Sequence, residues 1–141
     1  MKTKTKITVR YAETDQMGIA HHSVYAVWFE AARTEFMREM GFPYAELEKM
    51  GILAPLLELH VKYGRPARYE DELLIETRLI KVTHTKLLFA YRVYDAKSER
   101  LLSQGSTLHG IVGKDLRPIR LQKVHPAFAQ ALVDVQEEDD S

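Results

Sequence analysis

Hydrophobic and polar residues alternate along most of the chain, and one long segment breaks this alternation. Ile7, Val9 and Tyr11 alternate with polar residues, which predicts a short strand with one buried face. From about residue 22 to residue 40 the spacing becomes helical, with apolar residues on more than half of the circumference. A helix of this kind is enclosed by other elements. Its apolar residues are Val24, Tyr25, Trp28, Phe29, Ala31, Ala32, Phe36 and Met40.

Gly41 and Pro43 are typical of a helix end, and a short helical segment is expected at residues 44–50. Alternation then returns in four predicted strands. Gly64 and Pro66 should bend or end the first of them, since proline cannot donate to a strand ladder. The strands begin near Leu57, Leu73, Leu87 and Leu102, and a last helix is predicted at Pro126–Val135.

The predicted order is therefore a strand, a long helix and four strands in succession. Consecutive strands with short connections pair antiparallel. One sheet with one very apolar helix is an α+β arrangement in which the sheet curls around the helix. We expect a single domain at residues 1–135. Residues 136–141 contain two Glu and two Asp and are expected to form a disordered, solvated tail.

Composition excludes several classes of function. The 141 residues carry 20 Lys plus Arg and 20 Asp plus Glu, so nothing indicates a nucleic acid or an anionic membrane as partner. Without cysteine there is no disulfide, thiolate metal site or cysteine nucleophile. Neither a secretory signal nor a segment apolar enough to span a bilayer is visible. We expect a cytoplasmic protein.

The segment between the first strand and the long helix concentrates ionisable side chains. Residues 11–25 contain two carboxylates, two histidines and two tyrosines. Asp15 precedes the helix, where free backbone N–H groups and the helix dipole favour negative charge. Such a position suits a reactive carboxylate, and also the stabilisation of a carbonyl oxygen that becomes negative.

These residues also have structural interpretations. Asp15 is equally typical of a capping or loop aspartate, Gly18 of a turn glycine, and Tyr25 of the helix core. His21 and His22 are adjacent, so on a helix their side chains would point apart, and no third ligand has suitable spacing. We therefore expect no metal site.

Two further features of the sequence complete this picture. Glu30 and Arg33 have the helical spacing of an ion pair. No phosphate-binding glycine loop, nucleotide fingerprint or nucleophile elbow is present.

The loop resembles the signature of the 4-hydroxybenzoyl-CoA thioesterase-like hotdog proteins, especially the branch that includes the Tol–Pal-associated acyl-CoA thioesterases. The similarity extends over about residues 7–126. Its motifs are Tyr11, Asp15, Gly18, His22 and Tyr25, followed by residues 29–35, 41–42 and 63–68.

The resemblance implies a hotdog fold, in which a five-stranded antiparallel sheet wraps one central helix and the sheets of two protomers join. It implies an acyl-CoA thioesterase without a cofactor, since coenzyme A is part of the substrate. Asp15 matches the catalytic carboxylate, as nucleophile or general base. His22 matches the residue whose backbone N–H faces the thioester carbonyl and whose imidazole is typical of the branch. Tyr11, Gly18, Tyr25 and, from the partner protomer, Leu56 would line the pocket.

Two positions depart from the family pattern. Val24 stands where the branch usually has Asn, which removes one polar contact. The bridge between the third and fourth strands, often basic in the benzoyl-type enzymes, keeps one permanent positive charge. The candidates for holding coenzyme A are Thr83, His84 and Lys86, with Arg117 and Arg120 as further candidates for its phosphates.

Other functions and assemblies stay open beside thioester hydrolysis. A non-catalytic acyl-CoA binding module is one alternative, and an acyl-thioester hydratase is another. Hydratases usually pair Asp and His more closely than Asp15 and His22 are spaced. The leucine-rich second strand is the expected edge for joining two protomers, as a homodimer or as a homotetramer of paired dimers.

Overall fold

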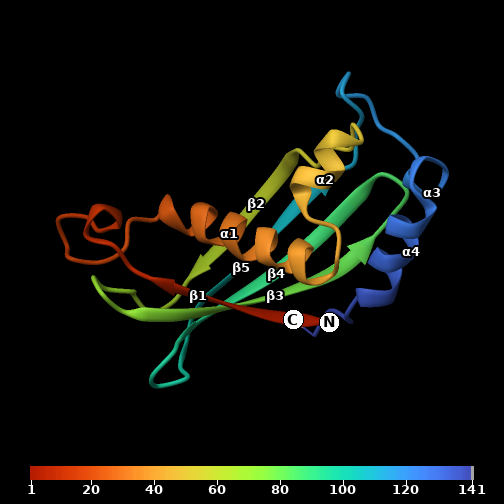
Figure 1. The fold of residues 1–141 in the computed structure, drawn as a ribbon. Helices are drawn as coiled ribbons and strands as arrows, with labels where there is room; N and C mark the ends of the chain where they lie inside the picture. The colour runs from red at the N-terminus through yellow and green to blue at the C-terminus, as the bar shows by residue number, and fades with distance from the viewer. Residues whose placement is uncertain (141) are drawn as a thin grey trace.

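The protein, seen here as a computed structural model that describes residues 1–140, is a five-stranded antiparallel sheet curled around one long helix (Figure 1). The predicted α+β architecture is confirmed. In chain order the elements are β1 (Lys2–Thr8), η1 (Tyr11–Glu13), α1 (Val24–Glu39), α2 (Tyr44–Lys49), β2 (Leu56–Tyr63), β3 (Glu72–Val82), β4 (Lys86–Asp95), β5 (Leu101–Gly110), α3 (Leu121–Val124) and α4 (Pro126–Val135).

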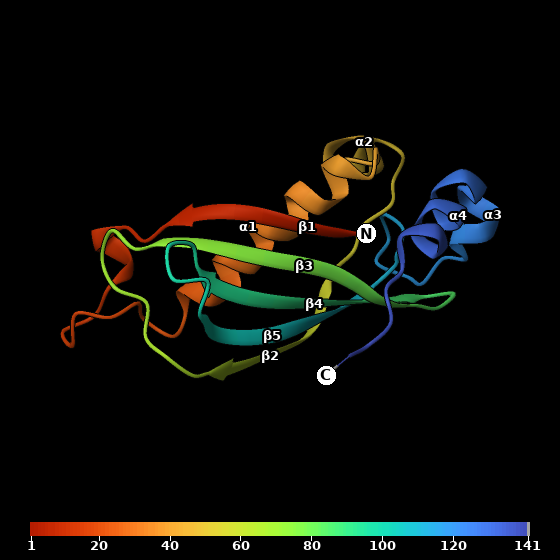
Figure 2. The same cartoon turned by 90° about the horizontal axis from the view of Figure 1, so that it is seen from below.

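The strands lie in the order β1-β3-β4-β5-β2, so β1 and β2 form the two edges (Figure 2). β2 was expected to pair with β3, its successor in the chain, and this was wrong because β2 pairs with β5. The connection at residues 64–71 is not a tight turn. It carries the chain to the opposite edge and is fixed on the way, where Ala67 O accepts from Ala20 N–H at 2.8 Å and Asp71 O accepts from Val9 N–H at 3.0 Å.

The core lies between α1 and the inner face of the sheet. Phe29 is fully buried and stacks on Tyr91, with ring centroids 4.3 Å apart. Gly105 on β5 makes room for this stack, because a Cβ there would lie 2.7 Å from the Phe29 ring. The wide apolar surface predicted for the helix is mostly buried, although Ala31 stays exposed.

Arg33 of α1 does not pair with Glu30, contrary to the ion pair that their spacing suggested. Its guanidinium reaches under the sheet and donates to the Tyr91 hydroxyl at 3.1 Å. Glu30 faces solvent. Helical spacing places two side chains on one face but does not fix which way a long side chain turns.

The first strand begins earlier than predicted. Lys2, Lys4 and Lys6 are exposed, whereas Thr3 is buried toward the core. Tyr11, expected to end this strand, instead lies in η1 with 76% of its surface exposed. The alternation of lysine and threonine was missed because threonine does not stand out as a buried residue.

The acidic C-terminal segment follows the outer face of the sheet, instead of forming the solvated tail that its charge suggested. Figure 2 shows it running from α4 across the strands. Glu137 N–H donates to Leu79 O at 2.8 Å. Asp140 Oδ1 lies 2.7 Å from Arg78 Nη1 and 2.8 Å from Arg92 Nη2. Residues 136–140 therefore have specific partners that lie far away in the sequence.

Candidate active site

Asp15 begins a tight turn that projects beyond the start of α1. Asp15 N–H donates to Ile19 O at 2.9 Å, and Asp15 O accepts from Gly18 N–H at 2.9 Å. Gly18 has a φ of 77°, which side chains with a Cβ rarely adopt. Gly18 is thus a turn residue whose N–H is bound within the loop, and its predicted place in the substrate pocket stays a prediction.

The carboxylate of Asp15 is held on one side only. Met17 N–H donates to Oδ1 at 2.8 Å. Among residues 1–140, no group donates to Oδ2. The side chain is half-buried. One oxygen is therefore fixed by the backbone, while the other can act on a substrate or on a water molecule.

The chain enters α1 through a turn that His21 stabilises. Its carbonyl accepts from Val24 N–H at 3.1 Å, and its Nδ1 accepts from Ser23 N–H at 3.2 Å. Neutral His21 therefore carries its proton on Nε2. The rings of His21 and His22 lie 4.0 Å apart, so they do not diverge as expected, because both precede the helix proper. No three His, Asp or Glu side chains within residues 1–140 are grouped as metal ligands.

His22 offers a free backbone donor at the start of α1. Its carbonyl accepts from the Tyr63 hydroxyl at 2.9 Å, which ties the loop to the end of β2. For the His22 N–H, no acceptor exists within the described residues. The amide precedes the first turn of the helix, where the dipole is positive. This arrangement suits the stabilisation of an oxyanion.

Glu13 anchors the loop, a role that the sequence did not reveal. The residue is 5% exposed, and its carboxylate accepts from Arg10 N–H at 2.8 Å and from Trp28 Nε1–H at 3.1 Å. Its carbonyl accepts from His21 N–H at 2.7 Å. Glu13 thus joins the segment before Asp15 to α1. In the sequence, only its position two residues before Asp15 pointed to the site. A glutamate near an arginine is otherwise typical of an exposed surface, so its burial was not expected.

Two tyrosines of the motif lie in different surroundings. Tyr25 is 3% exposed and packs between Trp28 and Tyr63, with ring centroids 4.8 and 5.0 Å away. Tyr11 is exposed and meets Tyr69 edge-on at 5.6 Å. Tyr25 supports the start of the helix from within, whereas Tyr11 is open to a ligand.

The other predicted ligand contacts lie far from Asp15 in the single chain. Leu56 is 51% exposed at the start of β2, and the β3–β4 hairpin lies at the end of the sheet opposite to the Asp15 loop (Figure 1). Thr83 and Lys86 border a hollow of about 320 Å³, together with Lys81 and His60, which sequence reasoning missed. His84 does not line this hollow.

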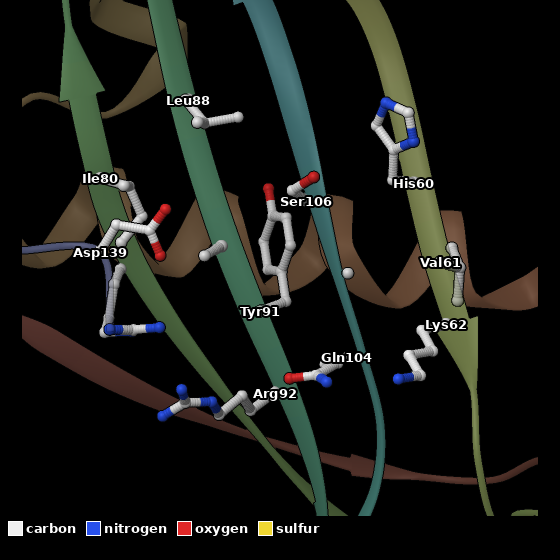
Figure 3. A pocket seen from close by; sticks show the side chains of 13 residues that line it. His60, Val61, Lys62, Ile80, Leu88, Tyr91, Arg92, Gln104, Ser106 and Asp139 are labelled. Carbon is white, nitrogen blue, oxygen red and sulfur yellow. The ribbon is translucent and has the colours of Figure 1, made fainter. Parts of the chain in front are cut away.

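A second hollow, of about 370 Å³, lies on the face of the sheet away from α1 (Figure 3). Figure 3 shows Arg92, Gln104 and Ser106 around it, with Asp139 of the C-terminal segment at its rim. Asp140 already binds the guanidinium of Arg92. This hollow is separated by the sheet from the helix start that carries the Asp15 loop.

Known proteins are similar to this chain in fold and in sequence. The Thioesterase-like superfamily profile matches residues 9–132. The chain is 35% identical to YneP of Bacillus subtilis over 130 residues, which cover 92% of this chain and 94% of YneP. It is 31% identical to the acyl-CoA thioester hydrolase YbgC of Escherichia coli over 102 residues, 72% of this chain and 75% of YbgC. The DHNA-CoA thioesterase of Staphylococcus aureus superposes with a TM-score of 0.91 at 34% identity, covering 95% of this chain and 90% of that one.

The chain therefore belongs to the thioesterase-like superfamily, and the predicted hotdog fold is confirmed. The predicted enzyme class, acyl-CoA thioesterase, is confirmed by the same relatives. Membership of the Tol–Pal-associated branch stays a prediction. Within residues 1–140, no helix is long and apolar enough to cross a membrane.

Proposed function

We propose that this chain hydrolyses acyl-CoA thioesters with Asp15 as its catalytic carboxylate. One observation carries the assignment: the Asp15 carboxylate has one oxygen bound by Met17 N–H and one without a donor, in the same loop as the unpaired N–H of His22. A carboxylate can act as nucleophile or general base toward a thioester, and an oxyanion donor stabilises the charge that develops on its carbonyl oxygen.

Two routes use these groups. In the first, Asp15 Oδ2 attacks the thioester carbon, the C–S bond breaks and coenzyme A leaves as its thiolate; water then hydrolyses the acyl–aspartyl anhydride. In the second, Asp15 takes a proton from water, the resulting hydroxide attacks the same carbon, and the C–S bond breaks so that coenzyme A again leaves as its thiolate. In both routes the carbonyl oxygen becomes negative, and His22 N–H donates to it. Water is the only co-reactant, so the reaction requires no cofactor.

The pocket is completed, in our proposal, by a second copy of the chain. β2 is an edge strand, and its apolar residues Leu56, Leu57 and Leu59 are 40–52% exposed. When two β2 strands pair antiparallel about a two-fold axis, the Leu56 end of one meets the Tyr63 end of the other. Tyr63 holds His22, so Leu56 of each copy reaches the Asp15 loop of its partner. A homodimer is the minimum assembly, and a homotetramer of two dimers is compatible with it.

The same pairing supports the predicted coenzyme A contacts. It brings the β3–β4 hairpin of one copy to the end of the sheet where the other copy has its Asp15 loop. The hollow beside this hairpin contains two lysines, Lys81 and Lys86, and the Thr83 hydroxyl. These groups suit the phosphates of coenzyme A. Arg117 and Arg120 follow β5 and are weaker candidates.

The test is turnover of a panel of acyl-CoA substrates, followed by release of free thiol. Asp15→Asn is nearly isosteric and should keep the fold by circular dichroism while losing about 10²-fold or more in kcat. His22→Ala should lose less, because the backbone N–H remains. Near wild-type turnover by Asp15→Asn would refute the site. Binding of acyl-CoA by the wild type without turnover would favour the non-catalytic binding module, and hydration of crotonyl-CoA would favour the hydratase.

Solvent ¹⁸O separates the two routes. In a single turnover with a nucleophilic Asp15, water attacks the anhydride, and part of the label enters the Asp15 carboxylate. Mass spectrometry of the peptide that contains Asp15 detects this change. Label in this peptide would establish the nucleophilic route, whereas an unlabelled peptide fits the general-base route and also an anhydride that water attacks at its acyl carbon.

A further inference from the structure

A continuous chain of hydrogen bonds runs beneath the sheet from α1 to the start of β2. Arg33 Nη1 lies 3.1 Å from the Tyr91 hydroxyl, which lies 2.6 Å from Thr107 Oγ1. Thr107 Oγ1 lies 2.8 Å from His109 Nε2, and His109 Nδ1 lies 3.1 Å from Ala54 O. Tyr91, Thr107 and His109 are 1–2% exposed. We call these three side chains the Thr107 relay.

The direction of every bond in the relay follows from its two ends. A backbone carbonyl only accepts, so His109 Nδ1 carries the proton that reaches Ala54 O. In neutral His109, Nε2 then accepts, and the donor must be the Thr107 hydroxyl. Thr107 in turn accepts from the Tyr91 hydroxyl, which accepts from the Arg33 guanidinium. Each hydroxyl gives one hydrogen bond and receives one, so the relay has a single arrangement of protons.

Neutral His109 is the form that its surroundings favour. Burial and, after it, the nearby charge of Arg33 lower the pKa of His109 from 6.5 to about 4, although the hydrogen bond to Ala54 O opposes both. At neutral pH the imidazole therefore stays uncharged, and the proton arrangement above holds.

The relay fixes the position of residues 53–55, the segment that leads into β2. Leu53 exchanges two backbone hydrogen bonds with Val112, both of 2.9 Å, and Pro55 O accepts from Gly110 N–H at 3.0 Å. Between them, the carbonyl of Ala54 is bound by a side chain, His109, instead of by the backbone of β5. The position of residues 54–56 thus depends on a buried side-chain network that starts at Arg33.

We propose that Thr107 and His109 are positioning residues for the active site of the partner protomer, because they fix the pocket wall at Ala54 and Leu56. The inference rests on the proposed function and on the antiparallel pairing of β2. It adds that a hydroxyl buried in one protomer controls catalysis by Asp15 of the other. Neither Thr107 nor His109 touches the substrate.

The chain offers a matched set of substitutions. Thr107→Val keeps the shape and removes the donor to His109, whereas Thr107→Ser keeps the hydroxyl. Thr77 on β3 is also fully buried, but among the described residues its hydroxyl has no hydrogen-bond partner. Thr77→Val therefore makes the same chemical change without a relay to break. We expect a loss in kcat/KM of about ten- to a hundred-fold for Thr107→Val, and near wild-type values for Thr107→Ser and Thr77→Val.

Heterodimers test whether the relay acts on the partner. Asp15→Asn and Thr107→Val chains with different affinity tags are expressed together, and the mixed dimer is isolated through both tags. In our arrangement, one of its sites combines an intact Asp15 with an intact wall from the other chain. The mixed dimer should therefore recover about half of the wild-type activity, although both parent homodimers are impaired.

The outcomes separate the relay from the proposed function. A mixed dimer no more active than its parents would overturn action on the partner site, and so would a Thr107→Val homodimer with wild-type kcat/KM. Loss of activity in Thr77→Val equal to that in Thr107→Val would also overturn the proposal, since buried Thr→Val changes in general would then explain it. If the wild type hydrolyses no acyl-CoA in the panel, the proposed function fails, and the relay proposal fails with it.

Discussion

Acidification should destabilise the fold through His109, and the size of the effect follows from its environment. The pKa of His109 falls from 6.5 to about 4 because burial and the nearby Arg33 disfavour the imidazolium. Above pH 6.5 the imidazole is neutral in both the folded and the unfolded chain, so it contributes no pH dependence. Between pH 6.5 and pH 4 the unfolded chain binds a proton that the folded chain does not, and stability therefore falls as the pH is lowered.

The magnitude comes from the gap between the two pKa values. One pKa unit corresponds to about 1.4 kcal/mol, so His109 removes about 2 kcal/mol from the free energy of unfolding by pH 5 and about 3 kcal/mol by pH 4. This is a substantial share of the stability of an ordinary domain.

Urea denaturation at fixed protein concentration, followed by circular dichroism at pH 7, 6, 5 and 4.5, measures the effect. His109→Gln removes the titrating group, and the difference between wild type and variant isolates its contribution. His84→Gln, in the exposed β3–β4 hairpin, is the matched control and should keep the wild-type pH dependence. If the wild type and His109→Gln lose the same stability between pH 7 and pH 5, the reasoning about His109 is wrong.

Two further predictions concern the loop and the edge strand. Glu13→Gln replaces one acceptor oxygen by an NH₂ group that faces the Arg10 or Trp28 donor. We expect the free energy of unfolding in urea to fall by about 1–3 kcal/mol and kcat to fall as well. Unchanged stability would contradict the role of Glu13 as an anchor of the loop. Leu59→Lys places a charge on the exposed apolar face of β2 and should lower activity and dimer content together in analytical ultracentrifugation, with Val27→Lys on α1 as control. A fully active monomeric wild type would refute the predicted interface.

Most of the fold could be predicted because its elements have local signals in the sequence. The apolar stripe of α1, Gly41 at its end and the helix at Pro126–Val135 depend on neighbours a few residues away. The partner of β2 could not be predicted in this way, since the pairing with β5 depends on the path of residues 64–71. The partners of Asp140 were hidden for the same reason, because Arg78 and Arg92 lie on strands far away in the sequence.

The same distinction between local signals and long-range contacts applies to the candidate site. Asp15 and His22 came from a motif that is contiguous in the chain, and the structure gives each an unused polar group. The burial of Glu13 depends on its contact with Trp28 of α1, and the hydrogen bond between Tyr91 and Thr107 joins β4 to β5. No spacing rule connects such residues, so only the folded chain reveals them.

The two edges of the sheet are unequal, and in the proposed dimer this difference limits further strand pairing. β2 presents leucines, whereas β1 presents Lys2, Lys4 and Lys6, charged residues that oppose the addition of another strand. When two copies join through β2, both free edges of the combined sheet are β1 strands. Growth into a fibre would require two lysine-bearing edges to meet, so strand pairing stops after a single step. In the proposed dimer, the lysines of β1 thus lie at both free edges of the joined sheet, where they oppose further strand pairing.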